Sequence, residues 1–305
     1  MNYIFLTYLS NDRDYKGALA INYMLKKHNS NYKLACITLE NVSDNIIIIL
    51  QQDEIILYRY SLTESLKTFN YNVDFINYLV NKHYYGKFLI YDLTIYDKII
   101  YLDTDLLIRE NIDHLFLNDC TENKCYMTYD TEYNVLNNDL LLRNYTFNSG
   151  VVIFQPNKHI CCQFYLNLKE KYENNVDLLK TDQDIFQIMN DDKIINVQHL
   201  EYKYNCPSMA SNYLVKNNFL EENLAIIHFT LSPKPWNFID FTDGILVNKY
   251  YSDFEKYLLE WIKIYNEMIL KNVSNCFDNK IYVNLNEVYL ITPLNNILIN
   301  TDHKF

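Results

Sequence analysis

Strand-like and helix-like segments alternate through the first hundred residues at the spacing of βαβ units. Apolar, strand-like runs occur at 3–9, 32–39, 54–60 and 98–102. Helical apolar spacing occurs at 14–27, 43–51 and 73–96, the last with a break near Gly86. This alternation predicts an α/β fold of the nucleotide-binding type.

After residue 103 the regular alternation of strand-like and helix-like segments ends, but no stretch rich in Pro, Gly or Ser separates the two halves. Strands are predicted at 125–128, 151–154 and 224–229, and helices at 157–172, 182–189 and 250–270. We therefore expect a single mixed domain over 1–247. Residues 248–305 should form a C-terminal helix and tail that pack on this domain or extend it.

Glycine is scarce, with four in 305 residues, whereas about 7% is average. Gly17, Gly86, Gly150 and Gly244 lie far apart, which argues against a glycine-rich dinucleotide fingerprint or a P-loop. The formal net charge of −11 is the wrong sign for a protein that coats nucleic acid or an anionic membrane. Any phosphate must therefore be held by a local cluster of cations.

The cysteines and the apolar runs indicate in which cellular compartment the protein is expected. Seven cysteines without a Cys-x-x-Cys pair predict free thiols in a reducing environment. The first residues lack the basic region of a secretory signal, and the longest aliphatic run, 46–50, is far shorter than the about 20 residues that cross a bilayer. We expect a cytoplasmic protein without a membrane span, and a homodimer is left open.

The sharpest motif is Asp103-Thr104-Asp105, which follows the apolar strand at 98–102. In extended backbone the two carboxylates would project to one side and converge on one cation, while Thr104 points away. Hard oxygen ligands at the carboxyl end of a strand suit Mg²⁺ or Mn²⁺ that carries substrate phosphates. The alternative without a function is a solvent-exposed turn, since Asp favours turns.

His228 and Lys234 form a second candidate group. His228 ends the apolar strand at 224–229 and could add a nitrogen ligand to the same ion, which would favour Mn²⁺ over Mg²⁺. Lys234 stands between two prolines, as a cation on a stiffened loop suited to a diphosphate. The alternatives are an ordinary core histidine and an ordinary surface lysine.

Two polar segments could contact a sugar. Asn148 and Ser149 precede the strand at 151–154, and Gly150 would let the backbone approach a ligand closely. Asp182 and Gln183 open a helix, where they are either part of its N-terminal cap or members of a sugar pocket. For Asn148 and Ser149 the alternative is a simple turn.

Together and in this order, these stretches resemble glycosyltransferase family 8, closest to its glycogenin-like branch. The matching blocks cover most of residues 3–240. They are the N-terminal strand with 14–19, Gly86-Lys87-Phe88, 101–105 with 111–116, 147–150 with 155–156, Asp182-Gln183, and His228-Phe229 with Lys234-Pro235-Trp236-Asn237.

The resemblance implies a GT-A fold, a Rossmann-like mixed sheet flanked by helices, with a UDP-sugar donor and Mn²⁺, Mg²⁺ being the alternative ion. It implies a metal site of Asp103, Asp105 and His228, and a catalytic set of Asp182, Gln183 and Lys234. It also implies a wider nucleotide-sugar site, with Leu9 and Tyr15 at the uracil, Lys87 and Lys234 at the diphosphate or sugar, Asn148, Ser149, Asp182 and Gln183 at the sugar, and Thr104 beside the metal ligands.

The function implied by the resemblance is retaining transfer of a hexose, from UDP-glucose or a related UDP-sugar, to a protein or a glycan. Self-glucosylation at Tyr213 is a weaker hypothesis. One alternative is a protein that binds a nucleotide sugar without turnover. Another is a haloacid-dehalogenase-type phosphatase with Asp103 as nucleophile, but that motif normally carries Thr where this chain has Leu107.

Overall fold

A computed structural model describes residues 1–67, 71–134, 139–174, 181–208, 224–230, 234–238 and 252–279. The strands are β1 (Tyr3–Leu9), β2 (Leu34–Leu39), β3 (Ile56–Tyr60), β4 (Lys98–Leu102), β5 (Leu106–Ile108), β6 (Lys124–Asn134), β7 (Asp139–Phe154), β8 (Asn196–His199), β9 (Cys206–Pro207) and β10 (Ile226–His228). The α-helices are α1 (Tyr15–Lys27), α2 (Asp44–Gln52), α3 (Leu62–Lys67), α4 (Val73–Asn81), α5 (Lys158–Glu173), α6 (Asp182–Asp191) and α8 (Ser252–Asn279). Short 3₁₀ segments include Asp12–Asp14, His83–Asp92, Tyr202–Tyr204 and Pro235–Phe238.

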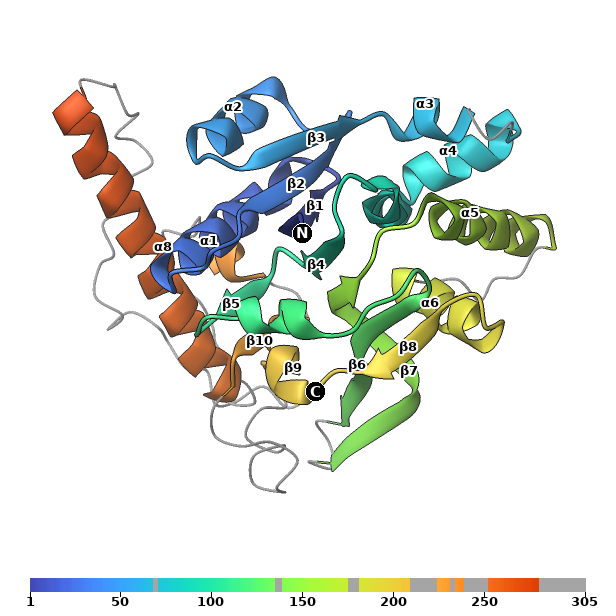
Figure 1. Ribbon diagram of the computed structural model, residues 1–305. Coiled ribbons are helices and arrows are strands. Elements are labelled where there is room, and N and C mark those ends of the chain that lie inside the picture. Colours follow the sequence, from blue (N-terminus) through green and yellow to red (C-terminus); the bar gives the residue numbers. More distant parts are fainter. Residues whose placement is uncertain are drawn as a thin grey trace, which may run out of the picture.

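The main sheet has seven strands in the order β3-β2-β1-β4-β7-β6-β8, and a three-stranded sheet has the order β5-β10-β9. The first four strands are parallel, whereas β7 runs antiparallel to both β4 and β6. The predicted mixed α/β sheet is therefore confirmed (Figure 1). The chain reverses its direction of travel across the sheet after β3, so that β4 pairs on the free side of β1.

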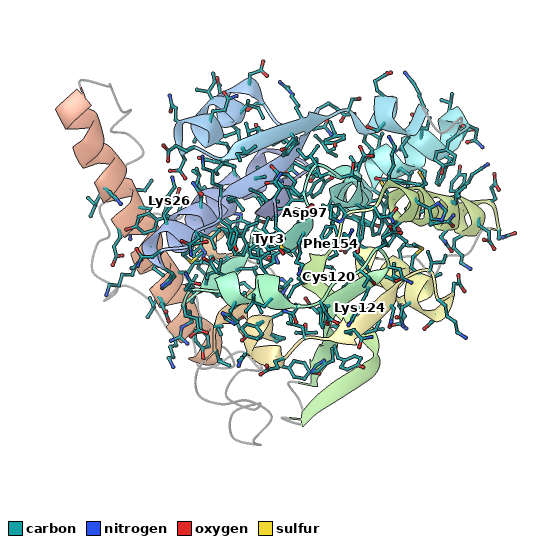
Figure 2. All side chains as sticks on the ribbon, viewed as in Figure 1. Tyr3, Lys26, Asp97, Cys120, Lys124 and Phe154 are labelled. Atoms are coloured by element: carbon teal, nitrogen blue, oxygen red, sulfur yellow. The ribbon has the colours of Figure 1, made fainter. Side chains whose placement is uncertain are left out.

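The main sheet is covered on both faces, and the side chains fill the space between sheet and helices (Figure 2). Strand alternation divides β1 between the two layers: Phe5 packs with α1, α2 and α8, while Ile4 and Leu6 pack with α4, α5 and α6. This burial on both faces explains why the first strands are continuously apolar in the sequence.

The helix predicted over 73–96 is wrong in part. Helix α4 begins at Val73, where Asn72 accepts a hydrogen bond from the Phe75 N–H at 2.8 Å, and it ends at Asn81. A 3₁₀ segment follows over His83–Asp92, so the break comes before Gly86. Helix α3 and strands β5, β8 and β9 were not predicted, because each is short and none has a distinct period.

Helix α8 begins after residue 240, where the stretches that resemble the glycosyltransferase family end, and it lies beside α1 (Figure 1). Its buried residues, among them Trp261, share one core with α1 and β5. Arg109, just after β5, reaches α8 through Nε to Glu260 Oε1 at 3.0 Å. The expected domain division at 247 lies outside the described residues. No described helix combines the length and apolarity needed to cross a bilayer.

Candidate active site

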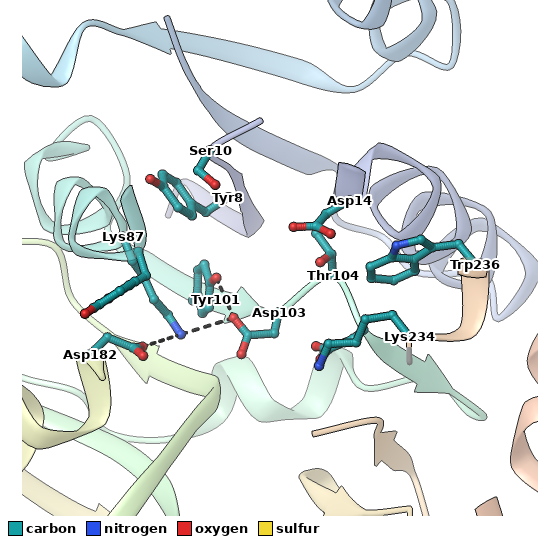
Figure 3. Close-up of a pocket in the computed structure, with 12 residues that line it drawn as sticks. Tyr8, Ser10, Asp14, Lys87, Tyr101, Asp103, Thr104, Asp182, Lys234 and Trp236 are labelled. Atoms are coloured by element: carbon teal, nitrogen blue, oxygen red, sulfur yellow. Dashed lines mark hydrogen bonds and ion pairs between the residues drawn. The ribbon is translucent and has the colours of Figure 1, made fainter. Parts of the chain in front are cut away.

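A pocket opens at the carboxyl ends of β1 and β4, where the strand order changes direction. In α/β sheets this switch point is where the loops diverge and leave a crevice for a ligand. The pocket is lined by Tyr8, Ser10, Asp14, Tyr84, Lys87, Tyr101, Asp103, Thr104, Asp105, Asp182, Lys234 and Trp236 (Figure 3). Most of these side chains are polar or charged, as expected of a site for an ionic ligand.

The Asp103-Thr104-Asp105 motif forms the turn between β4 and β5, and is not extended as the sequence suggested. Backbone bonds fix the turn at both ends: Asp103 N–H donates to Gly150 O at 2.8 Å, and Phe229 N–H donates to Asp105 O at 2.9 Å. The two carboxylates converge through this turn. Thr104 also lines the pocket, although strand alternation would have turned it away.

His228 completes a group that could hold a metal ion. The pairing of β10 with β5 sets His228 opposite Leu106, next to the turn. Its Nε2 lies 3.2 Å from Asp105 Oδ1 and 3.8 Å from Asp103 Oδ2. One ligand atom from each of the three residues lies within 4.8 Å of the others. Two carboxylate oxygens and one imidazole nitrogen form a donor set that suits Mn²⁺ better than Mg²⁺.

Lys87 is a buried cation between two carboxylates. Its Nζ lies 2.9 Å from Asp182 Oδ2 and 3.1 Å from Asp103 Oδ1 (Figure 3). Burial lowers the pKa of Lys87, but the charges of Asp103 and Asp182 outweigh it and raise the pKa above the usual lysine value. Lys87 therefore stays protonated and joins the metal group to the start of α6.

Asp182 lies at the start of α6, with its carboxylate in the pocket. Besides Lys87, it accepts a hydrogen bond from Ser149 Oγ at 2.6 Å. Burial raises its pKa, but the Lys87 charge and the Ser149 bond outweigh burial, and the pKa is lowered. The cap of α6 is Thr181, whose N–H donates to Asp184 Oδ2 at 2.8 Å. Asp182 is therefore free of the capping role and faces the pocket.

Lys234 lies on the other side of the metal group. Its Nζ donates to Asp105 Oδ2 at 2.5 Å and to Phe229 O at 2.8 Å. Burial raises the pKa of Asp105, but His228 and Lys234 together hold it well below the usual carboxyl range. Lys234 is thus a pocket residue in contact with a candidate ligand, not an ordinary surface lysine.

Two glycines make these contacts sterically possible. A Cβ at Gly150 would lie 2.3 Å from His228 Cε1, and a Cβ at Gly17 would lie 2.4 Å from Thr104 O and 2.7 Å from the Trp236 ring. The close approach expected at Gly150 is therefore an approach to the imidazole of His228. Gly17 lets the first turn of α1 sit against both the acidic turn and the 3₁₀ segment over Pro235–Phe238.

Several predicted residues lie beside the pocket and do not line it. The side chains of Leu9 and Tyr15 pack in or against the core of the α1 face. Asn148 and Ser149 are buried, Ser149 in contact with Lys87 and Asp182, and Asn148 in contact with Asn205. Gln183 follows Asp182 on α6, and its Oε1 is buried without a hydrogen-bond partner among the residues that the structure describes. Tyr213 lies outside the described residues.

The pocket also contains residues that were not predicted as members. They are Tyr8, Ser10, Asp14, Tyr84, Tyr101 and Trp236. Tyr8 lies on β1 and Ser10 directly follows the strand, on either side of Leu9, so strand alternation could have found them once one face was known to be core. Tyr101 donates to Asp103 Oδ1 at 2.6 Å, and burial with this carboxylate raises the phenol pKa, so the hydroxyl remains a donor. Burial, with Asp105 and Asp103, raises the pKa of Asp14.

Solved structures show which fold class this arrangement represents. The galactosyltransferase LgtC, in complex with donor and acceptor sugar analogues, is 13% identical with a TM-score of 0.58, over 86% of this chain and 95% of LgtC. The glycosyltransferase GlyE of Streptococcus pneumoniae is 21% identical with a TM-score of 0.52, over 89% of this chain and 65% of GlyE. The fold is the GT-A fold of these enzymes.

The sequence comparisons give the family. The profile of glycosyl transferase family 8 matches residues 6–240, and the chain belongs to this family. The uncharacterized protein R707 of Acanthamoeba polyphaga mimivirus is 24% identical over 88% of this chain and 95% of that protein. Glycogenin-1 of Oryctolagus cuniculus is 26% identical over 77% of this chain and 65% of glycogenin-1. GlyE is 26% identical over 64% of this chain and 46% of GlyE. The chain thus spans less than two thirds of GlyE and of glycogenin-1.

The phosphatase alternative is wrong, because the family and the fold are those of glycosyltransferases.

Proposed function

We propose that this protein is a retaining, metal-dependent glycosyltransferase that moves a hexose from UDP-glucose or a related UDP-sugar to a hydroxyl of a protein or a glycan. The observation that carries the proposal is the convergence of Asp103, Asp105 and His228 within 4.8 Å at the switch point of the sheet. Lys87 and Lys234 flank this group on either side. The retaining stereochemistry and the uridine nucleotide come from the family resemblance.

The charge of the pocket supports a divalent cation. Its lining includes four carboxylates, from Asp14, Asp103, Asp105 and Asp182, against two ammonium groups, from Lys87 and Lys234. A pocket with this excess of negative charge repels a diphosphate unless a cation compensates. Mn²⁺ bound by Asp103, Asp105 and His228 would supply that compensation and, as a Lewis acid, stabilise the leaving diphosphate.

The protein's own residues have complementary tasks. Lys234 lies on a loop at the edge of the metal group, where its ammonium can exchange Asp105 for a phosphate oxygen of the donor. Lys87 and Ser149 hold Asp182 ionised and fixed in the pocket wall. An ionised carboxylate in this place would stabilise the positive charge that develops at the anomeric carbon as the bond to the diphosphate breaks. The acceptor hydroxyl would then form the new bond to the anomeric carbon from the face that the diphosphate leaves, and its proton would pass to the departing diphosphate.

The test is release of UDP by the purified protein from UDP-glucose, UDP-galactose, UDP-N-acetylglucosamine and UDP-xylose, with Mn²⁺ and with a chelator. We expect metal-dependent release from one donor, no release by Asp105→Asn, and normal release by Asp119→Asn. Asp119 is a matched control because it lies at the surface, paired with Lys124. Release that persists in the chelator or in Asp105→Asn would contradict the proposed metal site.

Intact mass of the same samples tests self-glycosylation, since a ladder in hexose steps would mark the chain as its own acceptor. Calorimetry with UDP and Mn²⁺ separates the binding-only alternative. Tight binding without release from any donor would favour a protein that holds a nucleotide sugar without turnover. Absence of binding would contradict the proposed site as a whole.

A further inference from the structure

Asn205 is a buried polar residue in the turn between the 3₁₀ segment Tyr202–Tyr204 and β9. Its Oδ1 lies 2.9 Å from His228 Nδ1, on the side of the ring away from Asp103 and Asp105. We propose that Asn205 is a positioning residue that keeps a proton on Nδ1 of His228, so that Nε2 is the ring nitrogen available to a metal ion held by Asp103 and Asp105.

The amide orientation of Asn205 follows from a chain of bonds that starts at the backbone. Gly150 N–H, which can only donate, points to Asn148 Oδ1 at 3.0 Å. That oxygen also lies 2.8 Å from the amide of Asn205, so the group of Asn205 that faces it must be the donor Nδ2. The remaining Asn148 amide nitrogen donates to Asp130 Oδ1 at 3.4 Å, in agreement with this orientation.

The orientation of Asn205 then decides the tautomer of His228. With Nδ2 used toward Asn148, and toward Thr128 Oγ1 at 3.0 Å, the oxygen of the Asn205 amide is the atom that faces the imidazole. An amide oxygen only accepts, so His228 Nδ1 must carry the proton. Nε2 is then the nitrogen that faces the acidic turn, 3.2 Å from Asp105 Oδ1, and a metal ion bound there would take the place of any proton on it.

The ring of His228 has little room to adopt another orientation. Its Cε1 and Nδ1 edge rests against Gly150, where even a Cβ would come within 2.3 Å. A flipped ring would place a carbon against Asn205 Oδ1 and leave that buried amide oxygen unpaired. The Gly150 backbone therefore both anchors the bond chain and confines the imidazole.

The value of this tautomer for catalysis rests on the proposed function, because a metal ion binds only an unprotonated ring nitrogen. A histidine with the opposite tautomer would present an N–H to the cation site. The proton on Nδ1 follows from the contact with Asn205, which is present without metal, so it can be measured separately.

The experiment is ¹⁵N NMR of histidine-labelled protein without metal, about two pH units above the ordinary histidine pKa of about 6.5, with the His228 signals identified by their loss in His228→Gln. We expect the wild-type Nδ1 signal to have the shift of a protonated nitrogen. Asn205→Leu should lose this pattern. Asn205→Asp should keep the proton on Nδ1, because the carboxylate still accepts from the imidazole, although it can no longer donate to Asn148 Oδ1. Asn167→Leu, which replaces a buried asparagine on α5, should leave it unchanged.

Mn²⁺ titration gives the second readout. Asn205→Leu should bind Mn²⁺ about 10- to 100-fold more weakly than the wild type, as is typical for loss of a residue that orients a ligand, whereas Asn167→Leu should bind as the wild type. A wild-type His228 without a proton on Nδ1, or an Asn205→Leu variant that keeps this proton, would overturn the proposal. Loss of the Nδ1 proton from Asn205→Asp as well as from Asn205→Leu would also overturn it. If wild-type protein bound no Mn²⁺, the proposed function would fail while the NMR spectrum still decided the tautomer.

Discussion

Replacing Lys87 with methionine tests how far the site depends on one buried cation. The substitution keeps the length and the apolar stem of the side chain, but it removes the charge that bridges Asp103 and Asp182. The Lys87 Nζ lies 3.1 Å from the first carboxylate and 2.9 Å from the second. It also donates to Ser149 O at 2.9 Å and Ser149 Oγ at 3.0 Å, so four contacts are lost together.

The expected cost follows from these distances and from the burial. At an effective dielectric constant of about 20, two unit charges about 3 Å apart attract each other by about 5 kcal/mol, most of which offsets desolvation. Removal of one partner from a buried pair costs about 3–5 kcal/mol. Because the side chains of Asp103 and Asp182 keep 27% and 17% of their exposure, we expect the lower end, about 3 kcal/mol at neutral pH.

The cost should shrink on acidification. In the wild type the pKa of Asp182 is lowered, because Lys87 and Ser149 outweigh burial. Its contribution to stability is therefore present above the carboxyl pKa of the unfolded chain and is lost as pH falls through the lower folded value. Without Lys87, burial would raise this pKa, so the variant would gain stability by protonation as pH falls. Down to about pH 4 the gain of the variant narrows the difference in unfolding free energy between the two proteins, and at lower pH the loss from the wild type narrows it further.

The assay is urea unfolding of both proteins from neutral pH down to about pH 4, near the ordinary carboxyl range. Lys98→Met is the matched control, since Lys98 is a partly buried lysine that donates to backbone carbonyls of Phe116 and Asn118. The difference in unfolding free energy between the wild type and Lys98→Met should not become smaller with falling pH in this way. A gap between wild type and Lys87→Met that stays constant over this range would refute the electrostatic account of the site.

Three further perturbations address other parts of the site. Asp105→Asn should weaken Mn²⁺ binding by about 100-fold or more while the circular dichroism spectrum stays native, and undiminished Mn²⁺-dependent turnover would show that the metal assignment is wrong. Gly150→Ala should cost about 1–3 kcal/mol of stability and weaken Mn²⁺ binding, because the new methyl group meets the ring of His228; an unchanged Mn²⁺ titration would contradict that contact. Trp261→Ala should cost about 3–5 kcal/mol in urea unfolding, whereas Leu270→Ala, on the exposed face of the same helix, should cost about 0.5 kcal/mol or less; equal costs would contradict the burial of Trp261.

The sequence predicted those parts of the molecule whose burial leaves a local pattern. Strands β1, β2, β4 and β10 are almost entirely buried, so their apolar runs could be recognised in the sequence. Asp103 directly follows β4 and His228 ends β10, so these two runs predicted where the candidate metal ligands lie. Strand β5 is only three residues long, and β8 is polar, so neither differs locally from a loop.

The connections behind the pocket could not be predicted, because they join residues that are distant in the chain. Ser149 donates to Asp182, 33 positions away, and Asn205 contacts Asn148, 57 positions away. Neither pair has a spacing that local periodicity can show. Hence the sequence indicates Asn148 and Ser149 only as candidate sugar contacts, and it gives no sign of the role of Asn205.

Helix α8 has a consequence for any attempt to study a shortened protein. The family match ends at residue 240, but Trp236 lies 6.2 Å from Trp261 between ring centroids, and the α1 face is completed by the apolar side of α8. A fragment trimmed to the homologous region would expose that apolar surface to water. It would also lose the helix that packs against Trp236, two residues after Lys234. If such a fragment were insoluble or inactive, the cause would be the missing helix. The result would say nothing about the chemistry of the pocket.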